Sequence, residues 1–238
     1  MRRSLAFGLV FGLSASAGAA PPSEKEVAAV ELGGKAPVAL SLLRARQSDG
    51  GLKLRLLVSP KDGKPDPKAA KKKPVSVMLY EGGGDDDGPS DKAFRNGAIE
   101  PFTLPGGQRG VRVDFEFQVP GSKKYKQVDT FIVSLEDTPR VVLESTTHRE
   151  RDRSKVCHEV EDTALVLEKD GKLFVRPASV LDSDLNDDDL PIDKTCRGKR
   201  PGPQITYKFD GETFLQIDPP PPPPKKKPGA TDDDDDDE

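Results

Sequence analysis

The chain has 238 residues, of which 34% are hydrophobic and 33% are charged, and it contains 23 prolines, 22 glycines and no tryptophan. The charged share exceeds the quarter that is usual for globular proteins, so we expect parts of the chain to remain unpacked. The formal net charge is −4, and once the two termini are set aside the body is nearly neutral. A neutral body argues against nucleic acid as a partner, because phosphate backbones are bound mainly through Lys and Arg.

The N-terminus predicts a secretory signal peptide. Arg2 and Arg3 form a positive start, residues 5–13 are almost wholly apolar, and residues 17–19 read Ala-Gly-Ala, which is typical of a cleavage site. A transmembrane anchor is the alternative, but the apolar run is far shorter than the roughly 20 residues that span a bilayer. No later stretch is apolar enough either, so we expect a soluble mature chain that is secreted or periplasmic, with no transmembrane segment after signal removal.

Export changes how the two cysteines are interpreted. Cys157 and Cys196 are the only pair in the chain, and an oxidising compartment favours a disulfide between them. A closed loop of about 40 residues would stabilise the fold by roughly 4 kcal/mol in the chain-entropy model. Metal binding by the pair is disfavoured, because the chain lacks C-x-x-C and has only two histidines.

A β-hairpin is predicted near the start of the mature chain. After a first short strand over residues 27–32, apolar residues alternate from Val38 towards Arg46 and again over residues 52–58. Between them, residues 48–51 read Ser-Asp-Gly-Gly, and glycine supplies the positive φ that hairpin turns require.

Two charged loops flank the next predicted strand, residues 75–80. Residues 61–74 hold six lysines, three prolines and almost nothing apolar, and residues 82–88 read Gly-Gly-Gly-Asp-Asp-Asp-Gly. We expect both to be solvated loops. They are either charged patches for different partners or spacers that keep the protein soluble.

The strongest strand signal covers residues 110–119, where five apolar residues occupy every second position. Side chains on a strand alternate between its faces, so this strand has one face on a core and the other in water. Residues 94–104 are expected to be less regular. Residues 131–135 are the expected hairpin partner, and residues 141–144 form one further strand.

Residues 145–155 are dense in charge and contain no apolar residue, so we expect a linker or, preferably, a long hairpin loop. A small β-meander follows, with strands over residues 163–168, 173–176, 205–209 and 214–217. Lys-Asp-Gly and Asp-Gly between these strands are typical hairpin turns. The disulfide would then tie the first of these hairpins to the last.

Together these elements predict an all-β protein of antiparallel sandwich or meander-type sheets with long charged loops. Residues 1–19 are the signal peptide, and residues 20–145 a β-sandwich-like unit. Residues 146–218 form a small disulfide-linked β-meander, either separate or part of the same domain. Residues 219–238 hold runs of proline, lysine and aspartate, which cannot pack. We expect a disordered, solvated tail there rather than a motif for proline-reading modules.

No arrangement of catalytic residues stands out. His158 directly follows Cys157, so the two side chains would face opposite ways on a strand, and an oxidised cysteine could not act as a nucleophile. The sequence also lacks G-x-S-x-G, H-E-x-x-H and a phosphate-binding glycine loop. Paired carboxylates among the 41 acidic residues stay open, but we expect that the protein is not an enzyme.

The most specific local signal is an acidic stretch. Calcium loops carry oxygen side chains at positions 1, 3 and 5, a backbone carbonyl at position 7 and a carboxylate at position 12. Asp182, Asp184, Asn186, Asp188 and Asp193 occupy these five positions. The stretch also resembles the D-x-N-x-D-G loop of dockerin-type and propeller-type calcium repeats. However, an aspartate stands where the sharp turn calls for glycine, and there is no second copy. We therefore expect no cofactor, with calcium as the open alternative to a plain acidic surface loop.

These features favour an exported, non-catalytic binding or structural module whose partner is an unknown protein or surface ligand. The first alternative is a calcium-stabilised adhesion-like or scaffold module that uses the 182–193 loop. The second is an unrecognised hydrolase.

Overall fold

The computed structural model describes residues 24–34, 36–61, 73–83, 90–118, 125–136, 138–186 and 189–217. The expected signal peptide and C-terminal tail lie outside these residues, as does most of the two charged loops expected on either side of residues 75–80. Within the described residues, no helix has the length and apolar character that crossing a bilayer would require.

Four antiparallel strands of the described chain form the smaller sheet, in sequence order. They are β1 (Lys25–Leu32), β2 (Val38–Arg46), β3 (Gly51–Pro60) and β4 (Val75–Gly83). β2 and β3 form the expected hairpin, and Gly50 in its turn has a positive φ of 87°. Leu40, Leu42, Leu54 and Leu56 are fully buried, so the alternation predicts the core face of this hairpin correctly.

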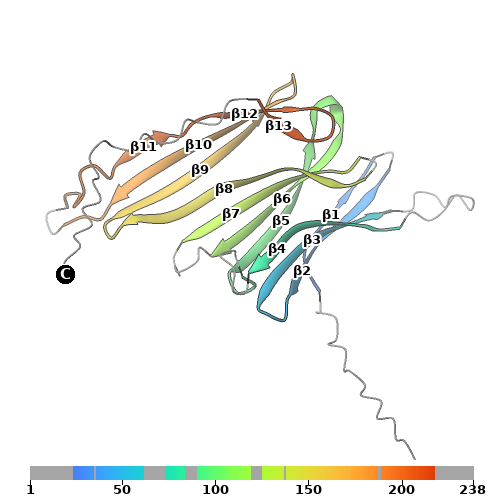
Figure 1. Ribbon diagram of the computed structural model, residues 1–238, viewed down its shortest axis with the longest axis horizontal. Coiled ribbons are helices and arrows are strands. Elements are labelled where there is room, and N and C mark those ends of the chain that lie inside the picture. The colour runs from blue at the N-terminus through green and yellow to red at the C-terminus, as the bar shows by residue number, and fades with distance from the viewer. Residues whose placement is uncertain are drawn as a thin grey trace, which may run out of the picture.

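The described residues form nine strands of the larger sheet. In chain order they are β5 (Phe94–Thr103), β6 (Arg109–Gln118), β7 (Lys126–Ser134), β8 (Arg140–Ser154), β9 (Cys157–Leu167), β10 (Lys172–Ser183), β11 (Gly198–Pro201), β12 (Ile205–Phe209) and β13 (Phe214–Gln216). A short 3-10 turn, η1 (Pro105–Gly107), joins β5 to β6. The strands meander from β5 to β10 and continue with β12 and β13, while β11 pairs with the far part of β10. The expected all-β, antiparallel fold is confirmed (Figure 1).

Strand β5 corrects the expectation that residues 94–104 are irregular. It pairs with β6 from end to end, with a β-bulge between Phe94 and Asn96 that shifts the alternation of its side chains. A glycine then replaces the next apolar residue. A Cβ on Gly97 would lie 2.6 Å from Cδ2 of Leu42, so glycine is required where the two sheets approach each other closely.

The main core lies between the smaller sheet and the first strands of the larger one. The sheets stack in the same order, so β1 contacts β5 on one side and β4 contacts β8 on the other. Strand β6 supplies the centre of this core, because Val111, Val113, Phe115 and Phe117 all point into it and are at most 1% exposed. The ring of Phe115 lies 5.3 Å from that of Phe131 on β7. The one-sided strand expected over residues 110–119 is therefore confirmed as far as Gln118, and residue 119 lies outside the described residues.

A second core forms on the opposite face of the larger sheet, where that sheet curls back on itself. Ile132, Leu143, Leu173 and Phe214 are buried there together. The β12–β13 end reaches the start of β8, since the Thr213 hydroxyl donates a 3.1 Å hydrogen bond to the carbonyl of Val142. The β12–β13 end of the sheet thus helps to cover the face of β7 and β8 that points away from the smaller sheet.

Strand β8 corrects the expectation of a linker or loop over residues 145–155. It is a single strand of 15 residues, and β9 follows it after a tight turn. Its second half needs no apolar residues, because both of its faces lie beyond the sandwich. Side chains of opposite charge stand across from each other on β8 and β9 there, such as Arg149 with Glu161 and Arg151 with Glu159. The boundary expected at residue 145 falls inside this strand, so one continuous sheet joins the two expected units.

Candidate functional site

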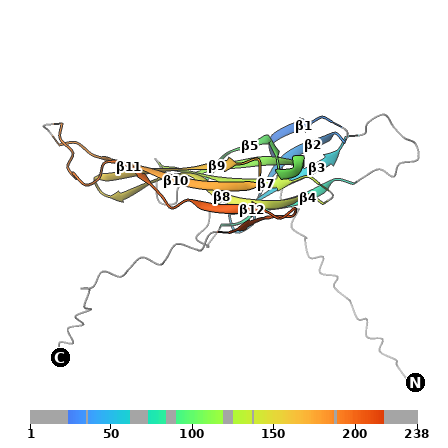
Figure 2. The same ribbon diagram turned by 90° about the horizontal axis from the view of Figure 1, so that it is seen from above.

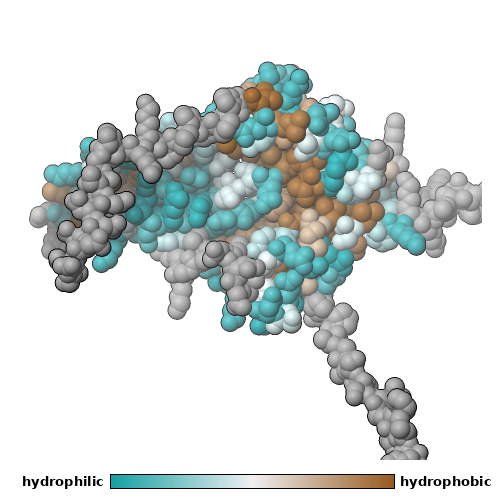
Figure 3. Space-filling view, viewed as in Figure 1, coloured by the Kyte–Doolittle hydropathy of each residue, from teal (hydrophilic) through white to brown (hydrophobic). Residues whose placement is uncertain are grey.

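The far ends of β8, β9 and β10 project beyond the sandwich as a single layer. β7 pairs with β8 only as far as Arg149. Beyond that residue, β8 is paired along one edge only, with β9, among the described residues. We call residues 150–161, 178–186 and 189–201 the arm. Figures 1 and 2 show that the smaller sheet covers the other half of the molecule and leaves the arm uncovered. On the face in Figure 3, hydrophobic residues gather over the two-layered half, and the described residues of the arm are mostly hydrophilic.

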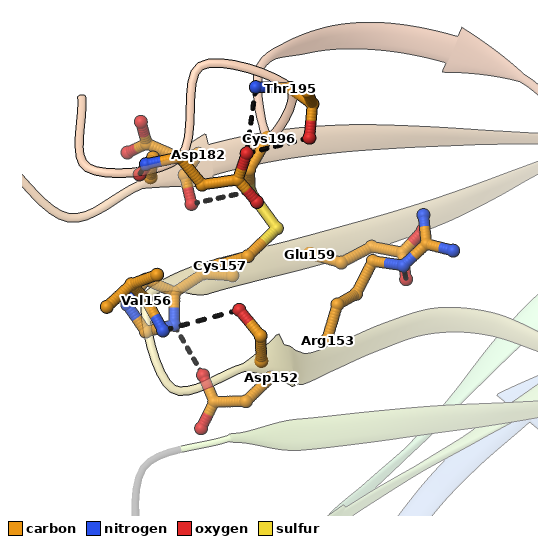
Figure 4. Close-up of a disulfide and its surroundings, with 12 residues drawn as sticks. Asp152, Arg153, Val156, Cys157, Glu159, Asp182, Thr195 and Cys196 are labelled. Carbon is orange, nitrogen blue, oxygen red and sulfur yellow. Dashed lines mark hydrogen bonds and ion pairs between the residues drawn. A yellow bond between two sulfur atoms is a disulfide. The ribbon is translucent and has the colours of Figure 1, made fainter.

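A disulfide joins Cys157 to Cys196 near the end of the arm, with their Cα atoms 5.8 Å apart (Figure 4). Together with Leu181 the two cysteines form a small buried cluster of their own. The sequence predicted that this bond would tie the 163–168 hairpin to the 205–209 hairpin, and that prediction is wrong. Because β10 runs on to Ser183, the bond instead joins the start of β9 to the connection between β10 and β11.

The same face of the arm buries a carboxylate. Glu159 is 4% exposed, and Nε of Arg151 donates to its Oε2 at 2.8 Å. Nε of Arg153 lies 3.8 Å from the same oxygen, and Figure 4 shows Arg153 beside Glu159. Burial alone would raise the pKa of Glu159. Hydrogen bonds from Arg151 and Ser179 and the charges of the two arginines outweigh burial and leave that pKa below its ordinary value.

The opposite face of the arm carries a histidine between two carboxylates. Nε2 of His158 lies 2.9 Å from Oδ1 of Asp184, and Nδ1 is in short contact with Oδ1 of Asp152. The hydroxyl of Tyr125 donates to the same Asp152 oxygen at 2.5 Å. Hydrogen bonds to Asp184 and then to Asp152 raise the pKa of His158, so its charged form is favoured.

The predicted calcium ligands are largely engaged with their own chain. Oδ1 of Asp184 accepts from His158, Oδ1 of Asn186 accepts from the Leu190 amide at 2.9 Å, and Oδ1 of Asp193 accepts from both the amide and the hydroxyl of Thr195. Asp182 lies on β10 and Asp188 lies outside the described residues. Among the described residues, the structure brings no three His, Cys, Asp or Glu side chains into a group that could hold a metal. Nothing here tests calcium binding, which stays the alternative to a plain acidic loop.

Between these carboxylates, the end of the arm exposes three aliphatic side chains. Leu185, Leu190 and Ile192 are 57%, 55% and 53% exposed. Two backbone hydrogen bonds join the described residues on either side of them, because the Asn186 amide donates to the Leu190 carbonyl at 2.9 Å and the Ile192 amide donates to the Asp184 carbonyl at 2.9 Å. We call residues 184–186 and 189–193 the tip. The sequence did contain this signal, since these are the aliphatic residues of an otherwise acidic stretch.

Two hollows in the described part of the chain are lined mainly by polar residues. One, of about 180 Å³, lies beside the disulfide and is lined by Arg153, Ser154, Cys157, Leu181, Asp193, Thr195, Cys196 and Arg200. The other, of about 310 Å³, lies at the β2–β3 turn and is lined by Arg46, Ser48, Asp49, Gly50, Ser90 and Lys92. Of the described carboxyl groups, Glu144 has a pKa raised by burial and by the charge of Asp129, but it lines neither hollow.

Comparison with known proteins finds no relative of this chain. No protein-family model matches the chain, and neither a curated protein nor a solved structure is found to be similar to it. Function must therefore be inferred from the arm itself.

Proposed function

We propose that the chain is an exported, non-catalytic binding module that holds a partner protein through the tip of its arm. One observation carries the proposal: three aliphatic side chains, each more than half exposed, occur within residues 185–192, in the tip that follows the end of β10. Exposed apolar residues that gather in one place are typical of contact surfaces. Single exposed aliphatics elsewhere on a protein need no such explanation.

The bracing of the tip supports this proposal. The tip is attached to β9 by the disulfide near its C-terminal end and by the bond between His158 and Asp184 near its N-terminal end. In addition, the amide of Asp193 donates a 2.9 Å hydrogen bond to the hydroxyl of Ser183. A loop held in one shape loses less conformational entropy when it binds, so this bracing favours affinity.

The charges around the tip indicate the chemistry of the partner. Asp182, Asp184 and Asp189 are exposed and lie close to the aliphatic residues in sequence. A complementary surface would offer an apolar pocket with Lys or Arg at its rim. The partner that fits best is therefore a protein with a basic-rimmed apolar pocket rather than another acidic surface.

Export is the second part of the proposal. The predicted signal peptide supports it, and a disulfide is a bond that persists in oxidising compartments. Reductive conditions inside the cell would remove one of these links, the disulfide.

The test is a binding comparison with two matched variants. Mature protein is immobilised and exposed to the exported fraction of its own cells, and retained proteins are identified, purified and titrated one at a time. L185S/L190S/I192S removes the aliphatic tip. L215S/I217S removes two aliphatics that are exposed to nearly the same degree, 52% and 51%, at the opposite end of the sheet.

The tip variant should bind the purified partner about a hundredfold more weakly or worse, because each aliphatic side chain buried on binding contributes about 1.5–3 kcal/mol. The control variant should bind as the unmodified protein does. A partner that binds both variants equally well, or the absence of any partner that prefers the unmodified tip, would contradict the proposal.

A further inference from the structure

The hollow beside the disulfide suggests a second binding site, on the face of the arm opposite to His158. Its lining combines two arginines with the hydroxyl-bearing residues Ser154 and Thr195, and the disulfide and Leu181 form its apolar part. Small-molecule sites usually measure about 300–1,000 Å³, so a volume of about 180 Å³ suits one small chemical group rather than a whole ligand.

The two arginines have donors to spare. A guanidinium carries five N–H donors. In the described part of the chain, Arg153 makes one ionic contact, with Glu159 at 3.8 Å, and Arg200 donates one hydrogen bond to the Thr195 carbonyl at 2.9 Å. Because Arg151 pairs with Glu159 at the shorter distance of 2.8 Å, the charge of Arg153 is only partly compensated.

The one acid in the lining offsets only one of these two positive charges. Asp193 accepts hydrogen bonds from the side chain and the backbone amide of Thr195, and these bonds, together with the charge of Arg200, lower its pKa and keep it ionised. Lys194 and Arg197, which flank the lining residues Thr195 and Cys196 in sequence, are both exposed and add positive charge to the same segment. The balance around the hollow therefore favours an anion.

We infer that this hollow binds a tetrahedral oxyanion, a phosphate or sulfate group, between Arg153 and Arg200. Arginine forks match the oxygens of such a group, and charge-assisted hydrogen bonds of this kind are about twice as strong as neutral ones. Ser154 supplies a hydroxyl donor at the wall, whereas the Thr195 hydroxyl already donates to Asp193. The group is either a free ion or the end of a larger phosphorylated or sulfated molecule.

The inference is tested by calorimetric titration of the mature, oxidised protein with sodium phosphate, sodium sulfate and glycerol 3-phosphate. Sodium chloride keeps the ionic strength constant, so that screening is the same in every titration. The variants are R200Q and R153Q/R200Q. The control, K169Q/K208Q, removes two exposed positive charges from the opposite end of the β9–β10 hairpin.

We expect millimolar binding by the unmodified protein and by the control, binding about tenfold weaker in R200Q, and none detectable in the double variant. R200Q leaves the contacts of Glu159 in place, so its loss of binding cannot be attributed to an unfolded arm. Tighter binding of glycerol 3-phosphate than of inorganic phosphate would show that the site prefers a phosphate group attached to a larger molecule. The reverse order would show that it prefers the free ion. Equal affinities of the unmodified protein and the double variant, or no binding to the unmodified protein by 50 mM (roughly fiftyfold above the expected dissociation constant), would overturn the inference.

Discussion

The side chains of His158 and Asp184 form a 2.9 Å hydrogen bond that joins the start of β9 to the residue directly after β10. The disulfide from Cys157 makes a second link from neighbouring positions of β9, on the other face of the strand. Two adjacent residues thus hold the two ends of the segment that forms the tip. One of these links depends on pH, and the other depends on oxidation.

The first prediction concerns pH. The folded-state pKa of His158 lies above the ordinary value of about 6.5, because Asp184 and Asp152 accept hydrogen bonds from its ring. The stability that this contact contributes is therefore fully present below about pH 6.5 and is lost as the pH rises through the folded-state pKa. Titration of the ring signals by NMR should give a pKa above 6.5, and D184N should bring it back towards that value.

The variant H148N serves as the control for this titration, because it leaves one histidine and so assigns the signal to His158. It also removes a side chain that lies between Asp162 and Glu150 without touching the tip. If the pKa of His158 were at or below 6.5, or if D184N left it unchanged, the bond would not hold the tip in solution.

Much of the fold could be predicted from the sequence because burial imposes a period of two. β2, β3 and β6 each have one face in the main core, and their residues alternate accordingly. The same reasoning fails for the second half of β8, which is a strand without a core to face. It also fails for β5, where a bulge and a glycine break the period.

The site was less accessible to sequence reasoning. Two cysteines in a chain with a predicted signal peptide are enough to predict the disulfide. The contact between His158 and Asp184 requires the lengths and register of β9 and β10, and the residues that end β10 carry no signal for its end. The acidic stretch suggested metal ligands, whereas the structure gives several of those oxygens partners within the chain.

The second prediction concerns the disulfide. The bond closes a loop with a sequence separation of 39, for which the chain-entropy model gives about 4 kcal/mol as the largest expected loss of unfolding free energy on reduction. Because the arm has one layer, the effect should be local. Hydrogen exchange after reduction, or in C157S/C196S, should accelerate in residues 157–161 and 195–200 and stay unchanged in β6. Equal acceleration in β6 would show that the bond stabilises the whole fold instead.

The third prediction concerns the buried carboxylate. E159Q should lower the free energy of unfolding by about 2 kcal/mol at neutral pH, since it removes the charge that Arg151 and Arg153 face. Its neighbour on the same face, Glu161, is less buried, so E161Q should change stability by no more than about 0.5 kcal/mol.

The difference in unfolding free energy between these two variants should shrink at low pH. The pKa of Glu159 is depressed in the folded state, so its contribution is present above the unfolded pKa of about 4.3 and is lost as the pH falls through the folded value. Urea titrations at pH 7 and pH 3 measure both effects. A difference that persisted undiminished at the lowest pH would contradict an ionic origin.

The fourth prediction decides between the acidic loop as a surface feature and as a calcium site. Calcium takes six to eight oxygen ligands. To supply them here, Asp184 would have to leave His158, and Asp193 would have to leave Thr195. We therefore expect the melting temperature in 5 mM calcium and in excess chelator to agree within about 1 °C. Calcium at a hundred times its dissociation constant would add about 2.7 kcal/mol to the free energy of unfolding. That would raise the melting temperature by roughly 5–10 °C for a chain of this size, so the melt would detect specific binding. A rise of that size that disappeared in D184N or D193N would establish the calcium-stabilised alternative.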